Sequence, residues 1–277
     1  MNKLIIIGFT LTILIINIPI TSASDNTIYV DDDFNESTPG WNVTHFNSIQ
    51  KAVNKATSGD TVFVNSGTYY EHVQVSESIL LAGENRETTI INGTGTGSVL
   101  YIDCKDVTVK GFTILNGSKG VEISSSFINI EENIIKENTR GIELYGSFNF
   151  ISKNKIVNNK HGIDIWSMFS LVYKNKISNN NLGIYLYVGG GWSPSNQLNL
   201  ISHNNLIENI KHASVESNAW SIFIHTIRFR RNYWDDWEGL EDPSKSFYPY
   251  VIELTDNVQE GAYLIDWLPK RIPNLIL

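Results

Sequence analysis

The sequence predicts an all-β fold, a right-handed parallel β-helix with about 21 residues in each coil. Glycines recur every 21 residues, asparagines keep the same interval in a second column, and each repeat alternates apolar and polar residues with a period of two. This alternation excludes helical solenoids, and the leucine consensus of a leucine-rich repeat is missing. The columns are Gly120, Gly141, Gly162 and Gly183 for glycine, and Asn133, Asn154 and Asn175 for asparagine.

Each repeat is expected to supply three short strands to one coil. The clearest strand follows the glycine, as in Ile142-Glu143-Leu144-Tyr145, where alternate side chains face opposite sides. Coils that stack about 4.8 Å apart turn equivalent residues into ladders. The 277-residue chain contains 37 Ile and 31 Asn, because Ile suits the inside of the coil and Asn can hydrogen-bond to the Asn of the next coil at a corner.

The glycine column and a phenylalanine column are expected to have structural roles in the coil. The glycines are expected at a corner with unusual dihedral angles or at a close approach of two backbones. Phe127, Phe148 and Phe169 also recur every 21 residues, and we expect a stacked aromatic ladder in the core or at a corner.

Both ends of the solenoid are expected to be covered. Apolar residues at helical spacing predict a capping helix over 46–56, and the coils are expected to occupy 61–231. Residues 232–277 contain four prolines and predict an irregular C-terminal cap. Residues 24–277 are therefore expected to form a single domain.

The first residues have the pattern of a secretory signal. Lys3 precedes an apolar run, and Thr21-Ser22-Ala23 offers small residues for cleavage, which predicts a signal peptide over 1–23. An uncleaved anchor is the alternative, because the run is close to the length of a spanning helix. We expect a secreted, extracellular or cell-surface protein, periplasmic if the host has an outer membrane.

Composition excludes several classes of function. Cys104 is the only cysteine, so neither an intrachain disulfide nor a cysteine zinc cluster can form. The net charge of −8 argues against a nucleic-acid-binding protein, which needs a basic surface.

Two stretches resemble known families. Ser48-Ile49-Gln50-Lys51-Ala52-Val53, with Gly59-Asp60-Thr61-Val62 and Gly67-Thr68-Tyr69-Tyr70-Glu71, is similar to the start of secreted pectin-lyase-like β-helix proteins. The coils and the Asn232-Tyr233-Trp234 ending resemble the NosD-type family, named for a periplasmic copper-processing accessory protein and shared with carbohydrate-binding and sugar-hydrolysis modules. The resemblance covers roughly residues 28–268 and implies the fold, whereas proteins of this fold have many activities.

The outward-facing ladders hold the candidate site. Glu122, Glu143 and Asp164 are expected to form one column, and Ser124 and the aromatic residues after it a second. Rings that stack on sugar C–H groups, beside acids that bind hydroxyl groups, favour a polysaccharide or surface glycan as the partner. The remaining residues predicted to contact this glycan are Tyr145, Trp166, Tyr185, Tyr187, Trp192, Arg140 and His161.

Two other functions stay open at this stage. The acids could catalyse polysaccharide hydrolysis or elimination, since adjacent rungs approximate the carboxylate separation of retaining glycosidases. A structural role in a surface layer or as an adhesin needs no small ligand. The simplest alternative is charge pairing, in which Lys119, Arg140 and His161 neutralise the acids three residues later. We expect a non-catalytic binding protein.

No cofactor is firmly predicted. Copper(I) prefers Cys and Met clusters, but the processed chain would keep only Cys104 and Met168, and the six histidines form no paired motif. Calcium is the ion that the acidic column could hold. Asp31, Asp32 and Asp33 are a second candidate for calcium, and their simpler interpretation is a solvated turn.

Overall fold

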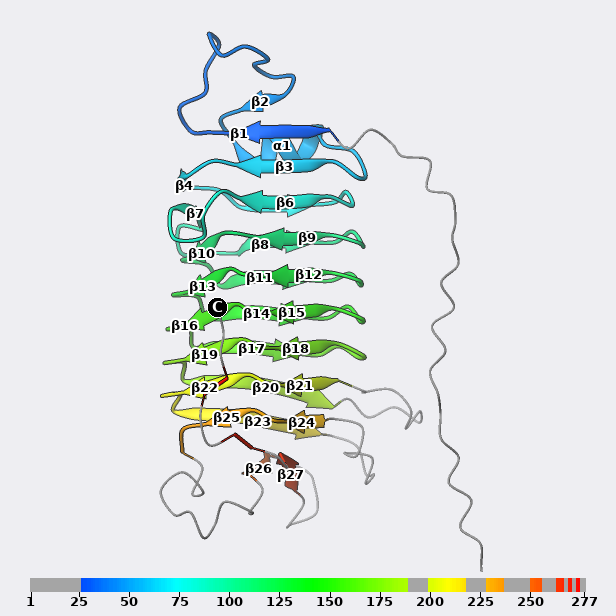
Figure 1. Ribbon diagram of the computed structural model, residues 1–277, viewed down its shortest axis with the longest axis vertical. Coiled ribbons are helices and arrows are strands. Elements are labelled where there is room, and N and C mark those ends of the chain that lie inside the picture. Colours follow the sequence, from blue (N-terminus) through cyan, green and yellow to red (C-terminus); the bar gives the residue numbers. More distant parts are fainter. Residues whose placement is uncertain are drawn as a thin grey trace, which may run out of the picture.

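The computed structural model describes residues 26–188, 199–217, 228–236, 250–255, 263–266, 269–270 and 273–274. These residues form a right-handed parallel β-helix whose coils stack along the long axis of the molecule (Figure 1). The predicted signal peptide over 1–23 and the predicted contact residue Trp192 lie outside the described residues. Within the described part of the chain, no helix is long and apolar enough to cross a membrane.

Three sheets form the sides of the β-helix, and we name them sheets A, B and C. Sheet A contains, in spatial order, β2 (His45–Phe46), β1 (Thr27–Val30), β3 (Thr61–Val64), β6 (Leu80–Gly83), β9 (Thr108–Lys110), β12 (Asn129–Glu131), β15 (Phe150–Ser152), β18 (Leu171–Tyr173), β21 (Leu200–Ser202) and β24 (Arg228–Arg230). Sheet B contains β25 (Tyr233–Trp234), β22 (Asn205–Ile207), β19 (Lys176–Ser178), β16 (Lys155–Val157), β13 (Ile134–Lys136), β10 (Thr113–Leu115), β7 (Thr89–Asn92) and β4 (Gly67–Tyr69). Sheet C contains β27 (Tyr263–Asp266), β26 (Tyr250–Thr255), β23 (Lys211–Ser217), β20 (Leu182–Val188), β17 (His161–Ile165), β14 (Arg140–Leu144), β11 (Lys119–Ile123), β8 (Ser98–Ile102) and β5 (Val73–Val75).

The pairing of strands confirms the predicted period. Ile142 pairs with Val121 on one side and with Ile163 on the other, each 21 residues away. The offset grows to 29 residues where Leu182 pairs with Lys211, because the repeat carries an insertion of eight residues between these two strands. The inward side chains of these strands are fully buried Ile, Val and Leu, so one apolar core runs along the axis.

The predicted asparagine ladder is present and fully buried. The Oδ1 of Asn154 accepts a hydrogen bond from the backbone N–H of Asn133 (3.0 Å), and its Nδ2 donates to the carbonyl of Ile130 (2.8 Å). Asn175 does the same for Asn154 one coil later. Each amide therefore satisfies backbone groups that a tight corner leaves without strand partners.

A second asparagine ladder, which we did not predict, occupies another corner. Asn138, Asn159 and Asn180 bond from coil to coil with the same geometry, and Asn209 continues the ladder after the insertion. Its period was visible in the sequence, because the first three residues also lie 21 apart. The two ladders together contain nine of the 31 asparagines.

The first ladder ends on a buried carboxylate. Asn232 continues it, and the backbone N–H and the Nδ2 of Asn232 both donate to Oδ2 of Asp266 at 3.0 Å. Trp234 Nε1 donates to the same oxygen (3.1 Å), and the backbone N–H of Arg231 donates to Oδ1 (3.1 Å). Asp266 therefore takes the place that the next asparagine would occupy and closes the ladder.

This arrangement corrects the predicted start of the C-terminal cap. We expected residue 232 to leave the repeat frame, but Tyr233 pairs in parallel with Asn205, and Asn232 holds the ladder position. The antiparallel pair of β26 and β27 follows and marks the end of the regular coil.

The glycines were expected at a corner with unusual dihedral angles or at a close backbone approach, and the phenylalanines in the core or at a corner. The structure selects one alternative for each column. A Cβ on Gly141 would lie 2.5 Å from the carbonyl oxygen of Gly162, and the left-handed backbone region is not required there, so close backbone approach explains the glycines. The phenylalanines lie at a corner and not in the core. Phe127 and Phe148 stack with ring centroids 5.4 Å apart and are 56% and 51% exposed.

The capping helix α1 (Ile49–Lys55) is shorter than predicted, because Phe46 belongs to β2. Ser48 caps its first turn, and the carboxylate of Glu71 accepts hydrogen bonds from the backbone N–H groups of Ile49 and Gln50 (both 2.9 Å). Its buried face covers the N-terminal end of the core beside β1 and β3 (Figure 1).

Candidate functional site

Sheet C presents three parallel columns of side chains on its outer face. The register places Glu122, Glu143 and Asp164 side by side, as predicted, between Tyr101 and Tyr185. We call the three acids the carboxylate column. Three residues before them lies the cation column, which is Lys119, Arg140 and His161. Two residues after Glu143, Asp164 and Tyr185 lies the aromatic column, which is Tyr145, Trp166 and Tyr187.

The carboxylate column is not exposed, which corrects the prediction. Glu143 is 2% exposed and Asp164 is 1% exposed, and only Glu122 is partly open to solvent. These side chains project outward from sheet C, but the long side chains of the cation column and the neighbouring rings cover them. Alternation along a strand determines which face a residue points to, whereas its exposure depends on the size of its neighbours.

Every acid of this column is paired with a cation. Lys119 Nζ lies 2.7 Å from Oε1 of Glu122 and 2.7 Å from Oε2 of Glu143. Arg140 Nε lies 2.8 Å from Oδ2 of Asp164 and 3.5 Å from Oε1 of Glu143. His161 Nδ1 lies 3.0 Å from Oδ1 of Asp164. The predicted charge pairing is therefore present, and it also links successive coils.

The pKa values differ along this network. Burial would raise the pKa of Glu122, but hydrogen bonds from Lys119 and Ser98 outweigh burial and lower it. Burial dominates at Asp164, so its pKa is raised although His161 and Arg140 act in the opposite direction. The pKa of Tyr145 is raised by burial and by a hydrogen bond to Glu143. The network is thus continuous from the acids to the first ring of the aromatic column.

The aromatic column is the exposed part of this face. Tyr145 is 45% exposed and Trp166 is 36% exposed. The centroids of these two rings lie 6.4 Å apart with an angle of 25° between their planes, and Trp166 and Tyr187 lie 4.6 Å apart at 35°. Tyr185 contacts Trp166 at 5.6 Å, and its hydroxyl donates a hydrogen bond to Glu216. Four predicted contact residues therefore form one continuous aromatic surface.

A polar pocket of about 580 Å³ lies beside α1 near the N-terminal end of sheet C. Gln74 lines it and is the register partner of Tyr101, so the pocket continues the line of the carboxylate column. The other polar side chains that line it are Gln50, Asn54, His72, Ser76 and Glu77. The prediction missed this pocket, because its residues lie upstream of the regular repeats.

Comparison with protein families finds one match. The model of the family described as "Periplasmic copper-binding protein (NosD)" matches residues 21–239. The chain belongs to this family. No curated protein matches the NosD-family chain at a significant level.

Solved structures with the same fold confirm the β-helix. The pectate lyase Pel9A superposes with a TM-score of 0.60 and 16% identity, over 75% of this chain and 62% of that enzyme. The chain therefore spans less than two thirds of that lyase. The pectin methylesterase from carrot gives a TM-score of 0.52 and 10% identity, over 76% of this chain and 83% of the enzyme. At these identities the likeness establishes the fold alone.

The family description implies copper, but the sulfur ligands of this chain do not fit it. Cys104 and Met168 lie in turns three coils apart, which separates them by about 14 Å along the axis. One copper ion cannot be bound by both. Soft sulfur ligands are what copper(I) prefers, and the described residues contain no other sulfur atom.

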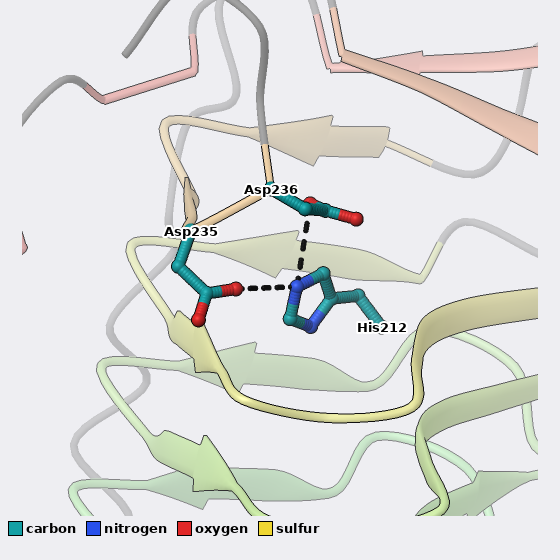
Figure 2. Close-up of side chains that lie close together, drawn as sticks. All are labelled: His212, Asp235 and Asp236. Carbon is teal, nitrogen blue, oxygen red and sulfur yellow. Dashed lines mark ion pairs between the residues drawn. The ribbon is translucent and has the colours of Figure 1, made fainter. Parts of the chain in front are cut away.

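The best histidine candidate does not fit a metal ligand either. His212 Nε2 lies 2.6 Å from Oδ1 of Asp235 and 3.3 Å from Oδ1 of Asp236, so both acids approach the same ring nitrogen (Figure 2). The other nitrogen, Nδ1, lies 3.1 Å from Nδ2 of Asn209. The Oδ1 of Asn209 accepts from Asn180, so its Nδ2 is the donor toward His212.

Nδ1 of His212 therefore accepts a hydrogen bond, and Nε2 carries the proton that points at Asp235. A metal-bound histidine has the opposite arrangement, in which the second nitrogen donates to an acceptor. The three residues form a hydrogen-bonded link between sheet C and the C-terminal end of the coil. No step of a mechanism is assigned to copper.

The second calcium candidate is close in space. One carboxylate oxygen from each of Asp31, Asp32 and Asp33 lies within 4.8 Å of the others. However, Asp31 already accepts hydrogen bonds from the backbone N–H of Asp33 (3.0 Å) and from Asn65 Nδ2 (2.8 Å). These bonds support the turn interpretation, and calcium at this place stays a prediction.

Proposed function

We propose that this NosD-family protein binds a polysaccharide or surface glycan along the outer face of sheet C. The observation that carries the proposal is the exposed aromatic column, in which Tyr145, Trp166 and Tyr187 present rings on three successive coils. Sugar rings pack their C–H faces against aromatic rings, and tyrosine and tryptophan add polar groups that hydrogen-bond to hydroxyls. The rise of about 4.8 Å between coils is close to the length of one sugar unit in an extended chain.

The buried carboxylate column supports binding over catalysis. A catalytic acid or base must reach the reacting atoms, within about 3 Å. Glu143 and Asp164 are covered and paired with Lys119 and Arg140, so their role in this proposal is to hold the sheet face rigid beneath the rings. We further propose that residues 1–23 direct the chain out of the cytoplasm and that the remainder is one domain. The family description, which names a periplasmic protein, supports this location.

Binding to a panel of immobilised polysaccharides tests the proposal. Trp166→Ala is expected to weaken binding at least tenfold, because a lost aromatic contact of about 1.4 kcal/mol corresponds to that factor. Phe148→Ala is the matched control, since Phe148 belongs to the other exposed ladder, three residues after Tyr145 in the turn from sheet C to sheet A, and it should leave affinity unchanged within twofold.

Four outcomes would contradict the proposal. Absence of binding to every polysaccharide would reject it, and so would equal losses in the two variants. Release of reducing sugar or of unsaturated product, abolished by Glu143→Gln or Asp164→Asn, would favour the hydrolase or lyase instead. Self-assembly of the purified protein without any glycan binding would favour a surface-layer role.

A further inference from the structure

The charges on the outer face of sheet C restrict the kind of glycan that can lie there. Between β8 and β23 the three outward columns, with the positions just beyond the strands, contain three cations and five carboxylates. The cations are Lys119, Arg140 and Lys211, and the carboxylates are Asp103, Glu122, Glu143, Asp164 and Glu216. Even when His161 is counted as a fourth cation, carboxylates outnumber cations on this face.

Two of these cations are already shared between acids. Lys119 bridges Glu122 and Glu143 at 2.7 Å each, and Arg140 bridges Glu143 and Asp164. Oε2 of Glu143 faces the Lys119 charge without a well-directed hydrogen bond, so the buried acids depend on these cations. A carboxylate on the ligand would compete for cations that the protein itself needs, and this would leave a buried acid unpaired.

The pocket beside α1 also lacks an excess of positive charge. Amide, hydroxyl and imidazole groups line it together with one carboxylate, Glu77, and no lysine or arginine is among its lining residues in the described chain. Gln50 and Gln74 hold each other in place, since the Gln50 Nε2 donates to the Gln74 carbonyl (3.1 Å) and the Gln74 N–H donates to Gln50 Oε1 (2.6 Å). Such groups hydrogen-bond to hydroxyls, and apart from the imidazole of His72 none of them can supply a positive charge to an anion.

We infer that the glycan is an uncharged polysaccharide and not a uronate polymer, although solved structures with this fold include a pectate lyase. The inference rests on the proposed glycan binding and deepens it by naming the class of ligand. The aromatic column would contact the sugar faces, and the acids and amides around it would contact the hydroxyls. A uronate on each sugar would instead meet an acidic surface.

Matched pairs of polymers test this inference. Each neutral polysaccharide is compared with its own C6-oxidised form, which carries uronates on the same backbone, by titration at 20 mM and at 500 mM salt. The neutral form is expected to bind at least fivefold more tightly at low salt. The difference should shrink at high salt, because screening weakens the repulsion.

A charge variant makes the test specific to sheet C. Asp103 is exposed in the column of the rings, on the side of the pocket, so Asp103→Lys should reduce the preference for the neutral form at least twofold. The control is Glu87→Lys, which makes the same change at an exposed turn between β6 and β7 and should not alter the preference.

The outcomes separate this inference from the proposed function. Equal or tighter binding of the oxidised polymers would overturn the inference and leave glycan binding intact. A preference that Asp103→Lys and Glu87→Lys change equally would also overturn it. Binding of neither form would reject both proposals.

Discussion

Replacement of Asn154 by alanine should destabilise the β-helix by roughly 3–5 kcal/mol. Asn154 is fully buried, and its amide serves the backbone N–H of Asn133 and the carbonyl of Ile130. The amide also donates to Oδ1 of Asn175 (3.1 Å). Each buried polar group left without a partner costs about 1–3 kcal/mol, and alanine leaves at least two.

Denaturant unfolding and native-state hydrogen exchange measure this effect. The Asn133 amide should exchange much faster in the Asn154→Ala variant, because its acceptor is gone, whereas amides several coils away should change less. Asn181→Ala is the matched control, since Asn181 is exposed, and it should cost less than about 0.5 kcal/mol. Equal costs for the two variants would mean that the ladder does not hold the coils together.

Replacement of Asp60 by asparagine should cost about 2 kcal/mol at neutral pH and less in acid. Asp60 is buried at the turn after α1, where Oδ1 accepts from the backbone N–H of Asn26 (3.1 Å). Its Oδ2 accepts from the N–H and the hydroxyl of Thr57 (both 2.8 Å). An asparagine amide must place its NH₂ group against at least one of these donors, which leaves that donor without an acceptor.

The pH dependence follows from the direction of the pKa shift. Burial acts to raise the pKa of Asp60, but the hydrogen bonds from Thr57 and Asn26 outweigh it and hold the pKa below the usual 3.8. A lowered pKa contributes stability that is present above pH 3.8 and is lost as the pH falls through the folded-state value.

The difference in unfolding free energy between wild type and Asp60→Asn should therefore be constant from pH 7 to 5 and decrease below pH 4. Unfolding curves at each pH measure it. Asp106→Asn removes an exposed carboxylate and should show neither the cost nor the pH dependence. A difference that grows as the pH falls would contradict the hydrogen-bond assignment.

The period in the sequence was sufficient to predict the fold and the register. Gly141, Asn154 and Glu143 each lie in a column with a spacing of 21 residues, and the paired strands keep that spacing. A repeat determines which residues are neighbours across coils, because equivalent residues of successive coils stack on one another. The residues of the carboxylate and aromatic columns could be identified for the same reason.

Exposure and contacts outside the period could not be predicted in this way. The burial of Asp164 depends on where the long side chain of Arg140 lies, which alternation along a strand does not specify. Asp266 closes the ladder from 34 residues beyond Asn232, a distance that belongs to no repeat. The proton position on His212 depends on the amide of Asn209, so only the three-dimensional contacts argue against a metal there.

Covalent footprinting with a bound polysaccharide tests the central claim most directly. The described part of the chain has two exposed aromatic ladders next to each other: Tyr145 with Trp166 directly follow the strands of sheet C, and Phe127 with Phe148 lie three residues further along, in the turns toward sheet A. Labelling by hydroxyl radicals, read by mass spectrometry, should fall at Tyr145 and Trp166 when the glycan is bound and stay constant at Phe127 and Phe148. Protection of the phenylalanines, or unchanged labelling of Tyr145 and Trp166 in the complex, would contradict binding on the outer face of sheet C.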